Sequence, residues 1–158
     1  MVRKLYYDID GTVLVLDTGV AKPALAGGRL ERAIRQARVD ELVCVGNFCG
    51  VIRTVWTVRP EYDGLGAVLA LCCGVFGDET WFRELTQLVL NPELRAAEVE
   101  LGDDWWYMDD QADKYFSDAG RAEVLRQHLG ERILQPSPRG DGEDVLSWLD
   151  MVARRDAF

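Results

Sequence analysis

Two groups of closely spaced aspartates are the residues of this sequence best suited to do chemistry. Asp8 and Asp10 lie in the segment Asp-Ile-Asp-Gly-Thr near the start of the chain, and Asp109 and Asp110 lie much later, with Asp113 close behind. Several carboxylates that meet at one point repel one another and raise one another's pKa unless a cation lies between them. Oxygen-only ligands of this kind suit a hard cation, so we expect Mg²⁺ where the two groups meet.

The first aspartate pair could instead belong to a calcium-binding loop, a phosphate-accepting receiver domain or a plain turn. A calcium loop starting at Asp8 needs glycine in sixth place and an acid in twelfth, where this chain has Val13 and Gly19. A receiver domain lacks the Asp-x-Asp-Gly-Thr turn and relies on a late lysine, and the last lysine here is Lys114. The plain turn stays open, because aspartate before glycine is common in turns. The second aspartate pair after a later apolar run favours a site over a turn.

Strands and helices must place these aspartates together. Each aspartate pair follows a short apolar run of strand length, at 5–7 and at 105–108. Other apolar runs and helical periodicities predict strands at 40–46 and 132–135, an extended segment at 52–59, and helices at 30–38, 64–73, 80–90, 118–129 and 143–155. In an open parallel sheet the ligand site forms beyond the carboxyl ends of the strands, which is where both pairs fall.

The alternation of strands and helices also indicates the fold class. Strands that are apolar throughout, rather than alternately polar, are typical of a parallel sheet with helices on both faces. We therefore expect an α/β protein with a three-layer α/β/α, Rossmann-like arrangement around a central parallel sheet. At roughly 150 residues per domain, the 158 residues form one domain, 1–158.

Two segments resemble motifs of the haloacid dehalogenase-like (HAD) superfamily. Residues 6–13, Tyr-Tyr-Asp-Ile-Asp-Gly-Thr-Val, resemble its first motif, and residues 107–110, Tyr-Met-Asp-Asp, are similar to its fourth. The resemblance implies a phosphatase in which Asp8 attacks a phosphoryl group to form an aspartyl-phosphate. It implies that Asp10 is the general acid and then the general base. It also implies that Mg²⁺ is held by Asp8, the Asp10 carbonyl, Asp109 and Asp110.

The resemblance also assigns the residues expected to bind phosphate. The family has Ser or Thr at the end of the next strand, where this chain has Asn47, and a lysine ahead of the fourth motif, where Arg95 has the right charge. Lys114 is the other candidate for that cation. The expected phosphate-binding set is Gly11, Thr12, Asn47 and Arg95. These two departures keep a second hypothesis open: a catalytically weak or inactive HAD-like protein that binds a metal, a phosphorylated ligand or a protein partner.

The segment 12–22 suits the small hairpin that this family carries after its first strand, with Asp17-Thr18-Gly19 as the turn. No large cap domain fits between this hairpin and the strand at 40–46. The resemblance therefore implies a capless member that is open to bulky substrates such as phosphoproteins or phosphorylated polymers, or closed by a second subunit in a homo-oligomer.

Charge and hydropathy exclude some classes of partner and location. The formal net charge is −9, and residues 98–118 carry eight carboxylates against one lysine, which argues against nucleic acid as a partner. Those carboxylates outside the proposed site, Asp103 and Asp104 among them, are expected to be solvated. No apolar run reaches the length of a membrane span, and the first residues of the chain have no apolar stretch long enough for a signal peptide, so a cytoplasmic protein is expected. The arginine-rich face of the predicted helix 30–38 is expected to be solvated rather than to bind an acidic partner.

Overall fold

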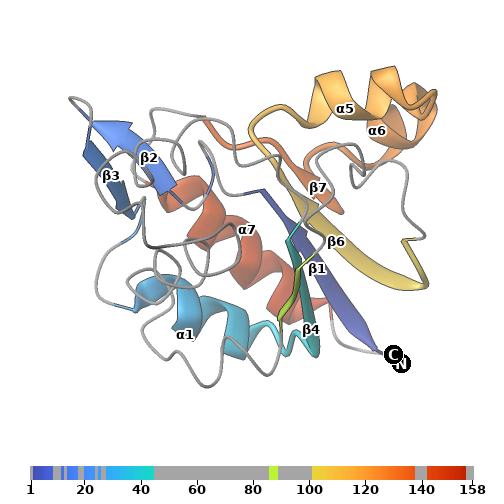
Figure 1. Cartoon of the computed structure of the whole chain (residues 1–158). Coiled ribbons are helices and arrows are strands. Elements are labelled where there is room, and N and C mark those ends of the chain that lie inside the picture. Colours follow the sequence, from blue (N-terminus) through green and yellow to red (C-terminus); the bar gives the residue numbers. More distant parts are fainter. Residues whose placement is uncertain are drawn as a thin grey trace.

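The chain forms an α/β fold with a parallel sheet. The computed structural model (Figure 1) describes residues 2–8, 12, 14–17, 20–23, 25, 28–44, 86–88, 101–137 and 142–155. Among them are the strands β1 (Arg3–Tyr7), β4 (Glu41–Cys44), β5 (Thr86–Leu88), β6 (Asp104–Met108) and β7 (Ile133–Leu134). These strands lie in the order β5-β4-β1-β6-β7, and each neighbouring pair is parallel.

The central strands are buried because their residues are apolar on both faces. In β1, Leu5, Tyr6 and Tyr7 are at most 3% exposed, and in β6 the run Trp105–Met108 is buried throughout. The register of the two strands pairs Tyr6 with Tyr107 and Tyr7 with Met108. The strands predicted at 5–7, 40–46, 105–108 and 132–135 are confirmed.

Helices pack against these strands on both faces. Tyr107 meets Phe116 of α5 (Ala112–Asp118) edge to face, with ring centroids 4.9 Å apart. Trp106, which points the other way because neighbouring residues of a strand alternate, meets Trp148 of α7 (Glu143–Arg154) at 6.2 Å. Helix α6 (Ala122–His128) follows α5, and α1 (Arg29–Gln36) lies beside α7 (Figure 1).

The predicted hairpin and two predicted helices are confirmed. Strands β2 (Leu14–Asp17) and β3 (Val20–Pro23) pair antiparallel, and the residues of the expected turn between them, 18 and 19, lie outside the described residues. Helices α1 and α7 fall within a residue or two of their predicted bounds. The four arginines of the α1 face are exposed as expected, and two of them form ion pairs, Arg35 with Glu31 and Arg29 with Glu143, each at 2.9 Å.

The helix predicted at 80–90 is wrong over Thr86–Leu88, which form β5. The apolar residues of 80–90 fit a helical period, but the segment Thr-Gln-Leu at 86–88 has a single apolar residue and so no period of its own. The parallel ladder with β4, which pairs Leu42 with Thr86 and Cys44 with Leu88, decides for a strand by satisfying the backbone.

The helix predicted at 118–129 is present as α6, which starts four residues later than predicted, and the preceding helix α5 was not predicted. Helix α5 ends at a left-handed glycine, Gly120, with φ +75°. There the Arg121 N–H donates to the Phe116 carbonyl at 2.7 Å, which ends α5 and lets α6 start at Ala122. The segments predicted at 52–59 and 64–73 lie outside the described residues.

Arg3 joins the helices to the sheet at the amino end of β1. Its side chain is buried and forms an ion pair with Asp104 at 3.1 Å. The same guanidinium donates to the carbonyls of Ala37, at the end of α1, and Val152, near the end of α7, at 2.7 and 3.2 Å. Asp104 also accepts a hydrogen bond from the Trp106 indole, so the expectation that Asp104 is solvated is wrong. Among the described helices, none is long and apolar enough to cross a membrane.

Candidate metal centre

The carboxyl ends of β1 and β6 bring the two aspartate groups together. Because Tyr7 pairs with Met108, the residues that follow, Asp8 and Asp109, leave the two strands side by side. Backbone hydrogen bonds of 3.1 Å fix both positions, from the Asp8 N–H to the Met108 carbonyl and from the Asp109 N–H to the Leu134 carbonyl. The sheet ladder itself therefore places both aspartates.

The order of the strands also makes this point of the sheet the expected place for a ligand. The chain starts in the middle with β1, adds β4 and β5 on one side, and then returns to add β6 and β7 on the other. The direction of building reverses between β1 and β6. Ligands of open α/β sheets bind in the crevice beyond the strand ends at such a switch point.

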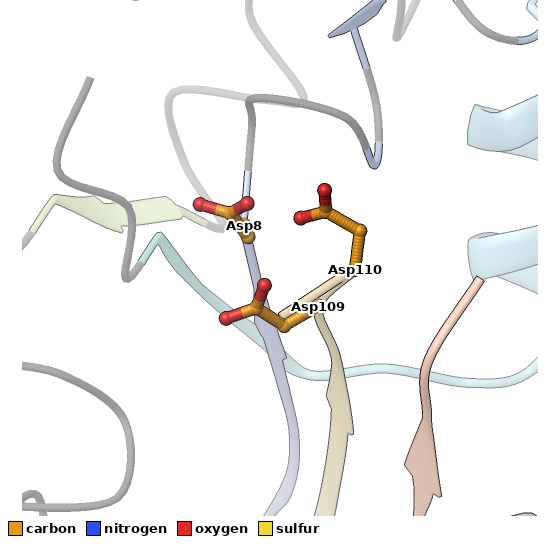
Figure 2. Close-up of side chains that lie close together, drawn as sticks. All are labelled: Asp8, Asp109 and Asp110. Atoms are coloured by element: carbon orange, nitrogen blue, oxygen red, sulfur yellow. The ribbon is translucent and has the colours of Figure 1, made fainter. Parts of the chain in front are cut away.

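Three aspartates meet there, as Figure 2 shows. Each of Asp8, Asp109 and Asp110 offers a carboxylate oxygen, and these oxygens lie within 4.8 Å of one another. Asp8 is 6% exposed, Asp109 is fully buried and Asp110 is half-buried. The expected convergence of Asp8 with the second aspartate pair is therefore present.

Asp109 is held by hydrogen bonds to both of its carboxylate oxygens. The Tyr107 hydroxyl donates to Oδ2 at 2.9 Å, and the Gln111 backbone N–H donates to Oδ1 at 2.9 Å. One donor comes from the strand and the other from the turn that leads into α5. The carboxylate is therefore fixed about its last side-chain bond before any cation binds.

The charge on Asp109 is costly in this position. Burial, together with the nearby charge of Asp110, raises the pKa of the Asp109 carboxyl from 3.8 to about 7, although the hydrogen bonds from Gln111 and Tyr107 lower it. Burial and the Asp109 carboxylate raise the pKa of the Tyr107 phenol far above its usual range, so this hydroxyl stays protonated and remains a donor. A cation would favour the charged form of Asp109 and release its proton on binding.

Thr12 links the two aspartate segments. Its side chain is 3% exposed, and its hydroxyl oxygen accepts a hydrogen bond of 3.1 Å from the Asp110 backbone N–H. This bond joins positions 12 and 110, which come from opposite sides of the switch point. Thr12 was expected to bind phosphate. In the structure its hydroxyl contacts the Asp110 backbone.

The cluster fits a hard divalent cation. Its ligands are all carboxylate oxygens, which Mg²⁺ and Ca²⁺ prefer. Oxygens on opposite sides of such an ion lie about 4 to 5 Å apart, so the 4.8 Å limit leaves room for one ion between them. Burial of like charges with no cation would be unfavourable, so the same residues gain stability from binding one.

The structure does not bring every predicted residue into this cluster. Four of them, Asp10, Gly11, Asn47 and Arg95, lie outside the described residues. Asp113 is exposed on the first turn of α5, and its backbone N–H donates to the Gln135 side chain at 3.2 Å. Lys114 is exposed and lies 5.9 Å from the centre of the Tyr115 ring. Within the described part of the chain it forms no ion pair with the three aspartates.

The role of the Tyr107 hydroxyl was not predicted from the sequence. A signal for it exists, because residues two apart in a strand point to the same face. A tyrosine two positions before a strand-end aspartate therefore has its hydroxyl on the aspartate's side of the sheet.

Comparisons with known proteins add no identity. No protein-family model, no curated protein and no solved structure matches the chain. Function is therefore inferred from the chain's own residues.

Proposed function

We propose that the protein is a Mg²⁺-dependent phosphoester hydrolase of the HAD type that acts through an aspartyl-phosphate on Asp8. One observation carries the proposal: the carboxylates of Asp8, Asp109 and Asp110 lie within 4.8 Å of one another at the switch point of a parallel sheet. The first of these belongs to the HAD-like segment 6–13, and the other two belong to the HAD-like segment 107–110.

The strand order supports the finer fold assignment in this proposal. Within the sheet, the order corresponds to third, second, first, fourth and fifth strands along the chain, which is the order of Rossmann-like sheets. We assign the protein on this basis to the three-layer α/β/α, HAD-like class without a large cap.

The proposed reaction has two displacements at phosphorus. A carboxylate oxygen of Asp8 forms a bond to phosphorus while the bond from phosphorus to the leaving oxygen breaks, and Asp10 gives that oxygen a proton. Asp10 then takes a proton from a water molecule whose oxygen attacks the aspartyl-phosphate. Inorganic phosphate leaves and the Asp8 carboxylate is restored. When bound, Mg²⁺ offsets the repulsion between the anionic phosphoryl group and the Asp8 carboxylate.

The residues around Asp8 position the cation and the attacking carboxylate. Asp109 and Asp110 hold the cation beside Asp8, and Thr12 keeps their turn joined to the loop that follows Asp8. Asp8 itself is almost fully covered, with its N–H bonded to β6, so its attacking oxygen keeps one direction relative to the substrate.

A phosphoester panel with and without Mg²⁺ tests the proposal. The panel contains an aryl phosphate, a phosphopeptide and a phosphorylated polymer, and the proteins are the wild type, Asp8→Asn and Asp103→Asn. Asp103 is an exposed aspartate near the start of β6 and serves as the matched control. We expect Mg²⁺-dependent release of phosphate by the wild type and Asp103→Asn, and background rates for Asp8→Asn. Hydrolysis that survives in Asp8→Asn would contradict the proposal.

The position of Lys114 favours a second candidate function. Lys114 is one of the two candidates to replace the motif lysine, and it is exposed and contacts the Tyr115 ring; the other candidate, Arg95, lies outside the described residues. Loss of a cation beside the transferring phosphoryl group costs orders of magnitude in rate. The alternative is therefore an HAD-like protein that binds Mg²⁺ and a phosphorylated ligand without turnover. The same panel separates the two, because this protein would bind the ligand with no release of phosphate.

A further inference from the structure

Tyr107 is the buried residue that contacts the proposed metal centre from the core side. Its ring is fully buried in the cluster that joins β6 to α5, edge to face with Phe116. Its hydroxyl is the one polar atom of this side chain, and it lies 2.9 Å from Asp109 Oδ2. A phenylalanine would fill the same space, so packing alone does not explain a tyrosine here.

We propose that Tyr107 is a positioning residue for the metal centre, and that its hydroxyl holds the Asp109 carboxylate in the orientation that binds the cation. The inference rests on the proposed function, since it concerns the same site. It adds a residue that does not itself touch the metal or the substrate.

Repulsion is the physical reason why Asp109 needs to be held. In their charged forms, Asp8 and Asp110 repel the Asp109 carboxylate, whose oxygen lies within 4.8 Å of theirs. The hydroxyl of Tyr107 and the N–H of Gln111 each occupy one oxygen of Asp109 and oppose its rotation away from them. A carboxylate oxygen has two lone pairs, so each oxygen keeps one for a metal ion. Partners of this kind typically change metal affinity by about 10- to 100-fold.

The neighbouring strand offers a matched control. Tyr6 is the register partner of Tyr107, belongs to the same buried cluster and is 3% exposed. Its hydroxyl donates to the Leu101 carbonyl at 3.5 Å, away from Asp109. Tyr6→Phe and Tyr107→Phe each remove one hydroxyl from the same buried cluster, and of the two described hydrogen bonds, the one lost in Tyr107→Phe is to the metal centre.

The test measures Mg²⁺ binding by calorimetry and the Mn²⁺ electron paramagnetic resonance spectrum in the full chain. We expect Tyr107→Phe to weaken Mg²⁺ binding by about 10- to 100-fold and to alter the Mn²⁺ spectrum. For Tyr6→Phe we expect binding within about twofold of the wild type and an unchanged spectrum. The spectrum reports the arrangement of the metal ligands, which a merely structural role would not move.

The outcomes separate this inference from the proposed function. Wild-type affinity and spectrum in Tyr107→Phe overturn the inference alone, and so do equal losses in both variants. Metal binding that depends on Tyr107 but is accompanied by no phosphoester hydrolysis overturns the proposed function alone. A wild type that binds neither Mg²⁺ nor Mn²⁺ overturns both.

Discussion

The two ends of β1 differ in what surrounds a buried charged side chain. Arg3 lies at the amino end of the strand, and Asp8 follows its carboxyl end. Arg3 is matched by Asp104 and by the carbonyls of Ala37 and Val152. Asp8 instead lies with two further aspartates, Asp109 and Asp110. Among the described residues, the amino end of the strand thus pairs a cation with a carboxylate, whereas the carboxyl end brings three carboxylates together. This difference separates the part of the sheet that maintains the fold from the part that is available for function.

The largest expected effect is at the amino end. Arg3→Met leaves the Asp104 carboxylate and the helix carbonyls without their cation, and breaking a buried pair in this way costs about 3 to 5 kcal/mol. We expect that loss in the free energy of unfolding measured with urea. Arg35→Met removes an exposed pair within α1 and should cost no more than about 0.5 kcal/mol. Similar losses in the two variants would mean that the contacts of Arg3 with Asp104 and the two helices do not stabilise the fold.

Asp109→Asn should raise the free energy of unfolding of the metal-free protein, whereas Arg3→Met lowers it. It removes a buried charge from the cluster, so we expect the metal-free protein to gain about 1 to 2 kcal/mol in urea unfolding at pH 8. The same variant should lose the stabilisation that Mg²⁺ gives to the wild type. Asp103→Asn, at an exposed position, should change neither quantity. Destabilisation by Asp109→Asn without metal would show that the cluster is not strained by its charge.

The pH dependence of stability follows from the raised pKa of Asp109. Between its ordinary value of 3.8 and about 7 this carboxyl holds its proton in the folded chain and loses it in the unfolded chain. The folded state then binds more protons, so this group makes the free energy of unfolding fall as pH rises through that range. The fall should be steeper in the wild type than in Asp109→Asn, by at most about 1.4 kcal/mol per pH unit.

Saturating Mg²⁺ should reduce the difference in pH dependence between the wild type and Asp109→Asn. The reduction should be greatest near pH 7, where Asp109 becomes charged. Urea unfolding at several pH values, with and without Mg²⁺, measures both effects. Parallel pH profiles for the wild type and Asp109→Asn would contradict the raised pKa of Asp109.

The smallest expected effect concerns Thr12. Thr12→Val removes the acceptor of the Asp110 N–H and should cost about 1 kcal/mol in unfolding, with a severalfold loss of Mg²⁺ affinity. Thr12→Ser keeps the hydroxyl, so it should retain most of the stability and most of the Mg²⁺ affinity. Calorimetry and urea unfolding of the two variants give the comparison, and equal behaviour of Val and Ser would rule out the hydroxyl contact as the cause.

Much of the sheet could be predicted because its strands are short apolar runs. Tyr6 and Tyr107 lie in such runs, and the residues that follow each run, Asp8 and Asp109, then had to reach the same edge of a parallel sheet. The hairpin was predictable for a local reason as well, since Asp-Thr-Gly at 17–19 is a sequence typical of turns and the flanking strands pair antiparallel. Local sequence decides features of these two kinds.

The remaining features depend on contacts between distant parts of the chain. Residues 86–88 form a strand because β4 is beside them, although the apolar spacing of 80–90 suits a helix. Local sequence predicts a solvated Asp104 because its partner, Arg3, lies 101 positions away. Pairings of this kind cannot be obtained from spacing or composition.

The most direct test of the central claim is calorimetric titration of the wild type and Asp109→Asn with Mg²⁺ at pH 7, in two buffers of different ionisation enthalpy. We expect a single site in the wild type whose binding releases protons, because the cation displaces the proton of Asp109. We expect no binding at this site in Asp109→Asn. Wild-type affinity in Asp109→Asn, or no binding by the wild type, would contradict the claim that the carboxyl ends of β1 and β6 form a metal centre.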